Sequence, residues 1–133
     1  MPVPRRRQEV PPPGLSMSAV GSGLVVGIIW MVIATAALLW PLLRTDYLDA
    51  QLPLVLRAIG LAGVLLGGII AGRRARNRGW LHGALVGVLY AGVATLLGAL
   101  LVSAPAAGAA TVGWRFASAV LIGALGGTVG VNL

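Results

Sequence analysis

Two arginines and two aromatic residues are the side chains of this sequence that could form a ligand site. Each lies in a long apolar stretch, and they are Arg57, Arg115, Trp30 and Tyr90. An arginine in such a stretch either extends its guanidinium to the membrane surface or faces the interior of a helix bundle. We expect the first arrangement, with Asp46 or Asp49 as ion-pair partner of at least one arginine. The second would create a site for an anionic headgroup or solute.

Trp30 and Tyr90 lie near the midpoints of their apolar stretches, away from the interfaces where aromatic residues usually gather. Each carries a polar group that needs a partner. Thr35 or Thr95 could supply one, although a threonine can also bond a carbonyl of its own helix. We expect the two rings to pack against glycine grooves, with a ligand site as the alternative.

His82 and four arginines precede Tyr90 along the chain. Histidine can titrate near neutral pH, but a single one without carboxylates nearby in sequence forms neither a metal site nor a proton relay. We therefore expect His82 to form hydrogen bonds at the membrane interface. The arginines should orient the chain and contact anionic lipid headgroups, at about 1 kcal/mol per arginine. They are Arg73, Arg74, Arg76 and Arg78.

The composition disfavours catalytic chemistry. The chain has no cysteine, and no acidic residue follows Asp49. Its glycine-rich segments lie inside apolar stretches, not between a strand and a helix as in a phosphate-binding loop. The net charge of +7 comes without a basic helix or stacking platform outside the membrane, so we do not expect nucleic-acid binding. We predict a protein that is not an enzyme and has no metal or cofactor.

Membrane-spanning helices must position these side chains. The sequence is 58% hydrophobic and 10% charged, and residues 10–43 and 79–114 carry no charge. Both runs exceed the roughly 20 apolar residues that span a bilayer. We predict an all-α membrane protein, a four-transmembrane-helix bundle made of two tandem helical hairpins. The predicted helices cover residues 19–43, 53–72, 80–102 and 113–131, after a disordered Pro/Arg-rich cytoplasmic tail at residues 1–18.

The arginine clusters at residues 5–7 and 73–78 predict the orientation of these helices. Cytoplasmic loops are enriched in arginine, so both clusters and both termini should lie in the cytoplasm. The second helix is the weakest of the four because Arg57 lies inside it. Without that helix, however, the two clusters would lie on opposite sides of the membrane. A signal peptide cleaved near Ala36 is a rival interpretation, but the apolar run continues to Trp40, which a cleavage site should not allow.

The two hairpins resemble each other in sequence. With an offset of 60 residues, Gly23 matches Gly83, Gly27 matches Gly87 and Trp30 matches Tyr90; with an offset of 58, Arg57 matches Arg115, Gly68 matches Gly126 and Gly72 matches Gly130. We predict from this a duplicated hairpin, whose copies are related by an axis along the membrane normal.

Glycines spaced four residues apart form grooves that let helix backbones approach closely in lipid. The predicted packing positions are Gly23, Gly27, Gly68, Gly72, Gly83, Gly87, Gly126 and Gly130. A pore or hinge lined by these glycines is the alternative.

One segment carries a family resemblance. Residues 68–74, with the sequence Gly-Ile-Ile-Ala-Gly-Arg-Arg, are followed by Gly-Trp-Leu-His-Gly at residues 79–83 and then by Gly87 and Tyr90. This pattern resembles an uncharacterised family of small four-helix membrane proteins of Gram-positive bacteria, best over residues 60–95. The resemblance implies four spans in a bacterial cytoplasmic membrane and brings no known activity.

These observations predict an integral membrane protein with a structural or accessory role, which packs on itself, on a second copy or in a larger membrane complex. A minimal transporter or channel, working as a dimer of the duplicated hairpins, is the alternative. A third class is a lipid-binding or stress-responsive membrane modulator, which would use the arginine turn, the segment that carries Arg73, Arg74, Arg76 and Arg78. The partners expected in every case are the lipid bilayer and anionic headgroups.

Overall fold

The computed structural model describes residues 14–44, 51–101 and 108–133. Four helices make up this part of the chain: α1 (Met17–Leu42), α2 (Leu52–Ala75), α3 (Gly79–Leu101) and α4 (Ala109–Asn132). All four are long and apolar enough to cross a membrane. The predicted all-α fold with four membrane-length helices is therefore confirmed. Most of the predicted tail, at residues 1–13, and the loop residues 45–50 and 102–107 lie outside the described residues.

Two helix ends differ from the prediction by more than two residues. Helix α2 continues past Gly72 to Ala75, so Arg73 and Arg74 belong to its last turn and not to the loop. Arginine is a good helix former, and its positive charge is favourable at the carboxyl end of a helix dipole. Helix α4 begins at Ala109 and not at residue 113. Its first turn is closed by the amides of Thr111 and Val112, which donate to the Gly108 carbonyl at 2.9 and 3.2 Å.

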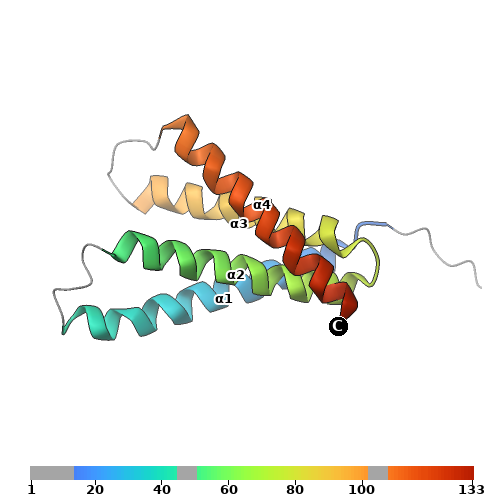
Figure 1. Cartoon of the computed structure of the whole chain (residues 1–133), viewed down its shortest axis with the longest axis horizontal. Helices are drawn as coiled ribbons and strands as arrows, with labels where there is room; N and C mark the ends of the chain where they lie inside the picture. Colours follow the sequence, from blue (N-terminus) through green and yellow to red (C-terminus); the bar gives the residue numbers. More distant parts are fainter. Residues whose placement is uncertain (1–13, 45–50, 102–107) are drawn as a thin grey trace, which may run out of the picture.

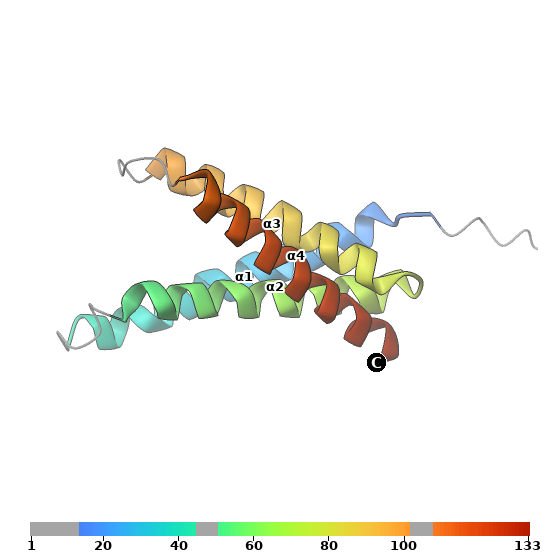
Figure 2. The same ribbon diagram turned by 45° about the horizontal axis from the view of Figure 1, so that its top comes forward.

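The helices form two antiparallel hairpins, α1–α2 and α3–α4, that approach closely at one end and diverge at the other (Figures 1 and 2). We call the first the closed end; it holds the start of α1, the turn Arg76–Arg78 and the end of α4. The other is the open end, where α1 and α3 finish. Helix α2 is central, because it packs against all three other helices.

Close backbone contacts join α1 to α2 in the half of the bundle nearer the closed end. A Cβ atom built on Gly27 would lie 2.9 Å from the Gly63 carbonyl oxygen, and one on Gly63 would lie 3.0 Å from the Gly27 oxygen. One turn nearer the closed end, a Cβ on Gly67 would lie 2.6 Å from the Gly23 oxygen. No side chain larger than hydrogen fits at these crossings without a shift of the helices.

Helix α4 lies between α2 and α3 and meets both through glycine. A Cβ on Gly68 would lie 2.6 Å from the Gly123 carbonyl oxygen, and one on Gly126 would lie 2.5 Å from that of Leu65. Gly83 of α3 lies against the same Gly123 carbonyl, and Gly87 lies against Ala119. Gly72 and Gly130 complete the contact between α2 and α4, against Gly127 and Ile69 respectively.

The positions of these glycines account for the shape of the bundle. Five glycines have open space where a Cβ would stand: Gly21, Gly92, Gly98, Gly108 and Gly113. Four of them lie on the open-end side of Tyr90 or Ala119. The only glycine there with a neighbour is Gly60, whose Cβ would make an ordinary contact of 3.5 Å with the Tyr90 hydroxyl. Close backbone approach through glycine is thus confined to the closed half, where the two hairpins come together.

The same contacts bear on the internal repeat. In the first hairpin Gly23 meets the carbonyl of Gly67 and Gly27 meets that of Gly63; in the second, Gly83 meets the carbonyl of Gly123 and Gly87 meets that of Ala119. These contacts match the first helices of the two hairpins at an offset of 60 residues and the second helices at an offset of 56, not 58. At an offset of 56, Arg57 falls on Gly113, so the contacts do not make Arg57 and Arg115 symmetry-related. The duplication itself stays a prediction.

Candidate functional site

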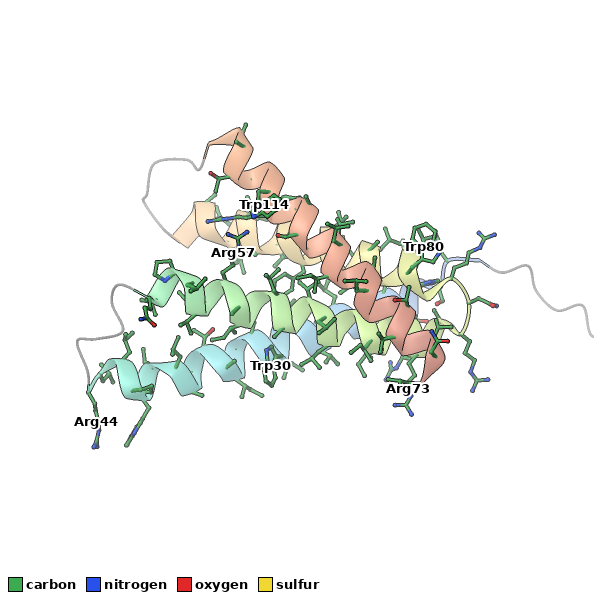
Figure 3. All side chains as sticks on the ribbon, in the orientation of Figure 1. Trp30, Arg44, Arg57, Arg73, Trp80 and Trp114 are labelled. Atoms are coloured by element: carbon green, nitrogen blue, oxygen red, sulfur yellow. The ribbon has the colours of Figure 1, made fainter. Side chains whose placement is uncertain are left out.

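A cavity of about 740 Å³ lies at the open end, between α2 and the α3–α4 hairpin. It is lined by three of the four predicted site residues, Arg57, Arg115 and Tyr90. Arg57 lies on α2 and Arg115 on α4. These two helices belong to different hairpins and contact each other closely only nearer the closed end. Figure 3 shows Arg57 and Trp114 in the space between α2 and α4.

Helical spacing explains why these residues share the cavity. On α2 the lining residues Arg57, Gly60, Leu61 and Val64 follow the i, i+3, i+4, i+7 pattern of one helix face. On α4 the lining residues Thr111, Trp114, Arg115, Ser118 and Ala119 continue the same pattern to i+8. Three further members of the site were not predicted from the sequence: Thr111, Trp114 and Ser118. Their spacing from Arg115 is the signal that could have found them.

The Arg57 guanidinium lies over the Trp114 ring, 6.0 Å from the ring centroid. At this distance the negative face of the indole attracts the cation and limits where the long side chain can go. The ring holds one face of the guanidinium and leaves the N–H groups at its edge able to donate. Both partners are exposed, with Trp114 at 62%, so this contact lies where the cavity opens to the surface.

The positive charge of the cavity has no acidic counterpart among the described residues, because all three acidic residues of the chain lie outside them. The expected ion pair with Asp46 or Asp49 falls on those undescribed positions. Arg115 has Ser118 one turn further into the cavity, but the Ser118 hydroxyl donates to the Arg115 carbonyl at 3.0 Å. The described part of the cavity thus presents two cations, hydroxyl groups and apolar walls.

Tyr90 lies at the inner end of the cavity. Its side chain is 7% exposed, and its hydroxyl is buried without a hydrogen-bond partner. Thr95, considered above as a partner, donates instead to the Ala91 carbonyl of its own helix at 2.7 Å. A buried hydroxyl without a partner is uncommon and calls for an explanation.

Trp30 is not among the residues that line this cavity, and its part in a ligand site stays a prediction. Its side chain is 39% exposed, and its Cδ1 atom lies 3.3 Å from the position of a Cβ on Gly63. Helix α1 lies on the far side of α2 from α4 and reaches the cavity only through Met31. The ring therefore covers a glycine groove, which is the packing role expected for it above.

His82 joins three segments at the closed end. It is 3% exposed, and its Nε2 atom accepts from the Ser16 backbone N–H at 3.1 Å. Its Nδ1 atom lies 3.1 Å from the Arg78 carbonyl oxygen, which can only accept, so Nδ1 carries the proton. The expectation that His82 forms hydrogen bonds is confirmed, and the bonds tie the start of α1 to the turn before α3.

The four arginines of the predicted lipid contact are exposed at the closed end. Arg73 and Arg74 lie in the last turn of α2, whereas Arg76 and Arg78 have positive φ angles of 54° and 47°. The left-handed conformation costs a non-glycine residue roughly 1–2 kcal/mol. Two arginines therefore occupy backbone positions that glycine would fill with less strain.

The fold and these sites define a small multi-pass membrane protein with a basic turn at one end and a cationic, largely apolar cavity at the other. Residues 16–130 match the family described as a protein of unknown function (DUF3792), and the chain belongs to that family. Comparisons with curated proteins and with solved structures found no match.

Proposed function

We propose that this protein is a non-enzymatic, structural or accessory component of a bacterial cytoplasmic membrane, with its closed end and both termini in the cytoplasm. The observation that carries the proposal is the confinement of the glycine contacts to the closed half. There the helices meet through backbone contacts, and apolar side chains are exposed on all four helices. Such a bundle suits packing within a membrane better than a cycle of large movements.

The orientation rests on the arginine turn. Arg73, Arg74, Arg76 and Arg78 lie at the closed end with the start of α1, and the residues before α1 include a further arginine cluster at 5–7. Cytoplasmic loops carry such clusters. The bacterial and Gram-positive assignment rests on the resemblance of residues 60–95.

A minimal transporter or channel is the second candidate, and the cavity with Arg57 and Arg115 is the observation in its favour. Below the cavity, however, Val64, Tyr90, Ala91 and Ala119 form a buried cluster. A second buried cluster, Val20, Ala71 and Val86, follows nearer the closed end. A continuous path would require α4 to leave its glycine contacts with both α2 and α3, which favours the accessory role.

Cysteine labelling tests both proposals, because the native chain has no cysteine. Single cysteines at Arg44, Arg74 and Val86 would be exposed to a membrane-impermeant thiol reagent in intact cells and after lysis. We expect position 44 to react from outside, position 74 to react only after lysis, and position 86 to stay unreactive. Reaction at position 86 from either side would favour the transporter, and outside reaction at position 74 would overturn the proposed orientation.

A further inference from the structure

We propose that the open-end cavity binds an anionic phospholipid from the leaflet opposite the arginine turn, with the lipid phosphate between Arg57 and Arg115. This inference goes beyond the proposed accessory function, because a packing unit needs no lipid site. It rests on the depth of the two cations, on the chemistry of the cavity walls and on the buried Tyr90 hydroxyl.

The two arginines lie at similar depth. Arg57 is five residues after the start of α2 at Leu52, and Arg115 is six residues after the start of α4 at Ala109. With a rise of 1.5 Å per residue, both lie about 7–9 Å inside the ends of their helices. This is within reach of the headgroup region, so a phosphate can meet both side chains without leaving the interface. Arginine presents paired N–H donors that fit phosphate oxygens.

Beneath the arginines the walls become apolar. The remaining lining from α2 and α3 includes Leu61, Val64, Ala91 and Ala94. A volume of about 740 Å³ falls in the range of small-molecule sites. A ligand with a charged head and an apolar body fits a cavity that is cationic near the surface and apolar further in. Free phosphate would leave the apolar part of the cavity without a partner.

The Tyr90 hydroxyl supplies a third, independent observation. It lies close to Gly60, one helical turn deeper than Arg57 on α2, or about 4.5 Å further in. A donor at that depth has no partner in the protein. The ester oxygens of a phospholipid lie just below its phosphate, and a rotation of the Tyr90 side chain, which lines the cavity, would turn its buried hydroxyl toward one of them.

The test measures lipid retained by the full chain. The protein would be reconstituted in phosphatidylcholine vesicles with a minor fraction of phosphatidylglycerol of the same acyl chains, extracted in mild detergent and examined by native mass spectrometry. Wild type should retain phosphatidylglycerol in preference to phosphatidylcholine. In the double variant Arg57→Gln/Arg115→Gln, the ratio of retained phosphatidylglycerol to phosphatidylcholine should fall about tenfold, because charge-assisted hydrogen bonds to phosphate are lost.

Two matched comparisons make the result specific. Arg44→Gln removes a cation at the open end that lies over Trp40, 4.8 Å from its ring centroid, and outside the cavity; it should retain the lipid. Gly60→Leu fills the apolar part and leaves both arginines, so it should lose the lipid, whereas Gly92→Leu points into open space and should not. Circular dichroism would check that each variant keeps its helices.

Three outcomes would overturn the proposal. Unchanged retention in the double variant would place the lipid elsewhere, for example on the arginine turn. An equal loss with Arg44→Gln would indicate general surface charge. Displacement of the lipid by millimolar inorganic phosphate would indicate a site for a small soluble anion.

Discussion

Gly83 of α3 and Gly123 of α4 lie so close that a Cβ atom on either residue would overlap the carbonyl oxygen of the other. The contact is reciprocal, and Gly123 also meets Gly68 of α2 through its carbonyl. One glycine therefore holds α4 against two helices at once. In lipid, where apolar surface gains nothing from leaving water, such approach is a main source of helix association.

Substitution at this crossing should destabilise the bundle. Gly83→Ala or Gly123→Ala forces the backbones apart, and overpacking of this kind costs about 1–3 kcal/mol. Thermal unfolding in detergent, followed by circular dichroism, would show a lower midpoint for both variants.

Gly92→Ala and Gly98→Ala are the matched controls, because a Cβ at either position meets nothing within 4 Å. Alanine is the better helix former by about 1 kcal/mol in water, so these variants should unfold at the wild-type midpoint or above it. If Gly92→Ala lowered the midpoint as much as Gly83→Ala, close helix packing would not be the reason for the loss of stability.

The turn between α2 and α3 should become more stable when its strain is removed. Arg76 and Arg78 have φ angles of 54° and 47°, which belong to the left-handed backbone conformation. Glycine adopts this conformation without penalty, so Arg76→Gly and Arg78→Gly remove the strain. We expect a gain of about 1 kcal/mol for each, measured as a higher unfolding midpoint. A side-chain role then explains why arginine stands there, since the backbone alone would favour glycine.

Arg74→Gly gives the comparison for this turn, because it removes the same charge from a helical residue. Glycine inside a helix is unfavourable by roughly 0.5–1 kcal/mol, so its midpoint should fall. If all three variants shifted the midpoint in the same direction, the charge and not the backbone conformation would be responsible.

The bonds of His82 should protect the first turn of α1. His82→Ala removes the acceptor of the partly buried Ser16 amide, and losing a hydrogen bond of this kind costs about 1 kcal/mol. Hydrogen exchange of the amides of residues 16–20 should accelerate. Ser16→Ala keeps the backbone donor and loses only the hydroxyl contact of 3.4 Å, so it should leave the exchange nearly unchanged. Equal acceleration in both variants would mean that the hydroxyl, and not the amide, carries the contact.

The sequence predicted the number and class of the helices because hydropathy and span length are local properties of the chain. It placed the end of α2 too early, since arginine reads as a loop residue in a membrane protein although it is also a good helix former. The sequence could not show that Trp30 and its match Tyr90 have different surroundings. The match equates α1 with α3, yet α1 lies outside α2 whereas α3 borders the cavity. Which helices are neighbours depends on side-to-side packing, and that is not encoded in the spacing along one helix.

Tyr90→Phe should have opposite effects with and without lipid. In the lipid-free protein the variant removes a buried hydroxyl that has no partner, and this should raise stability by about 1 kcal/mol. When phosphatidylglycerol is added, wild type should gain more in unfolding midpoint than the variant, because only wild type can donate to the bound lipid. The measurement is the unfolding midpoint of both proteins in detergent, with and without phosphatidylglycerol. A variant that gained as much from the lipid as wild type would show that the hydroxyl takes no part in binding, and its buried position would then be a cost of packing the ring between α2 and α3.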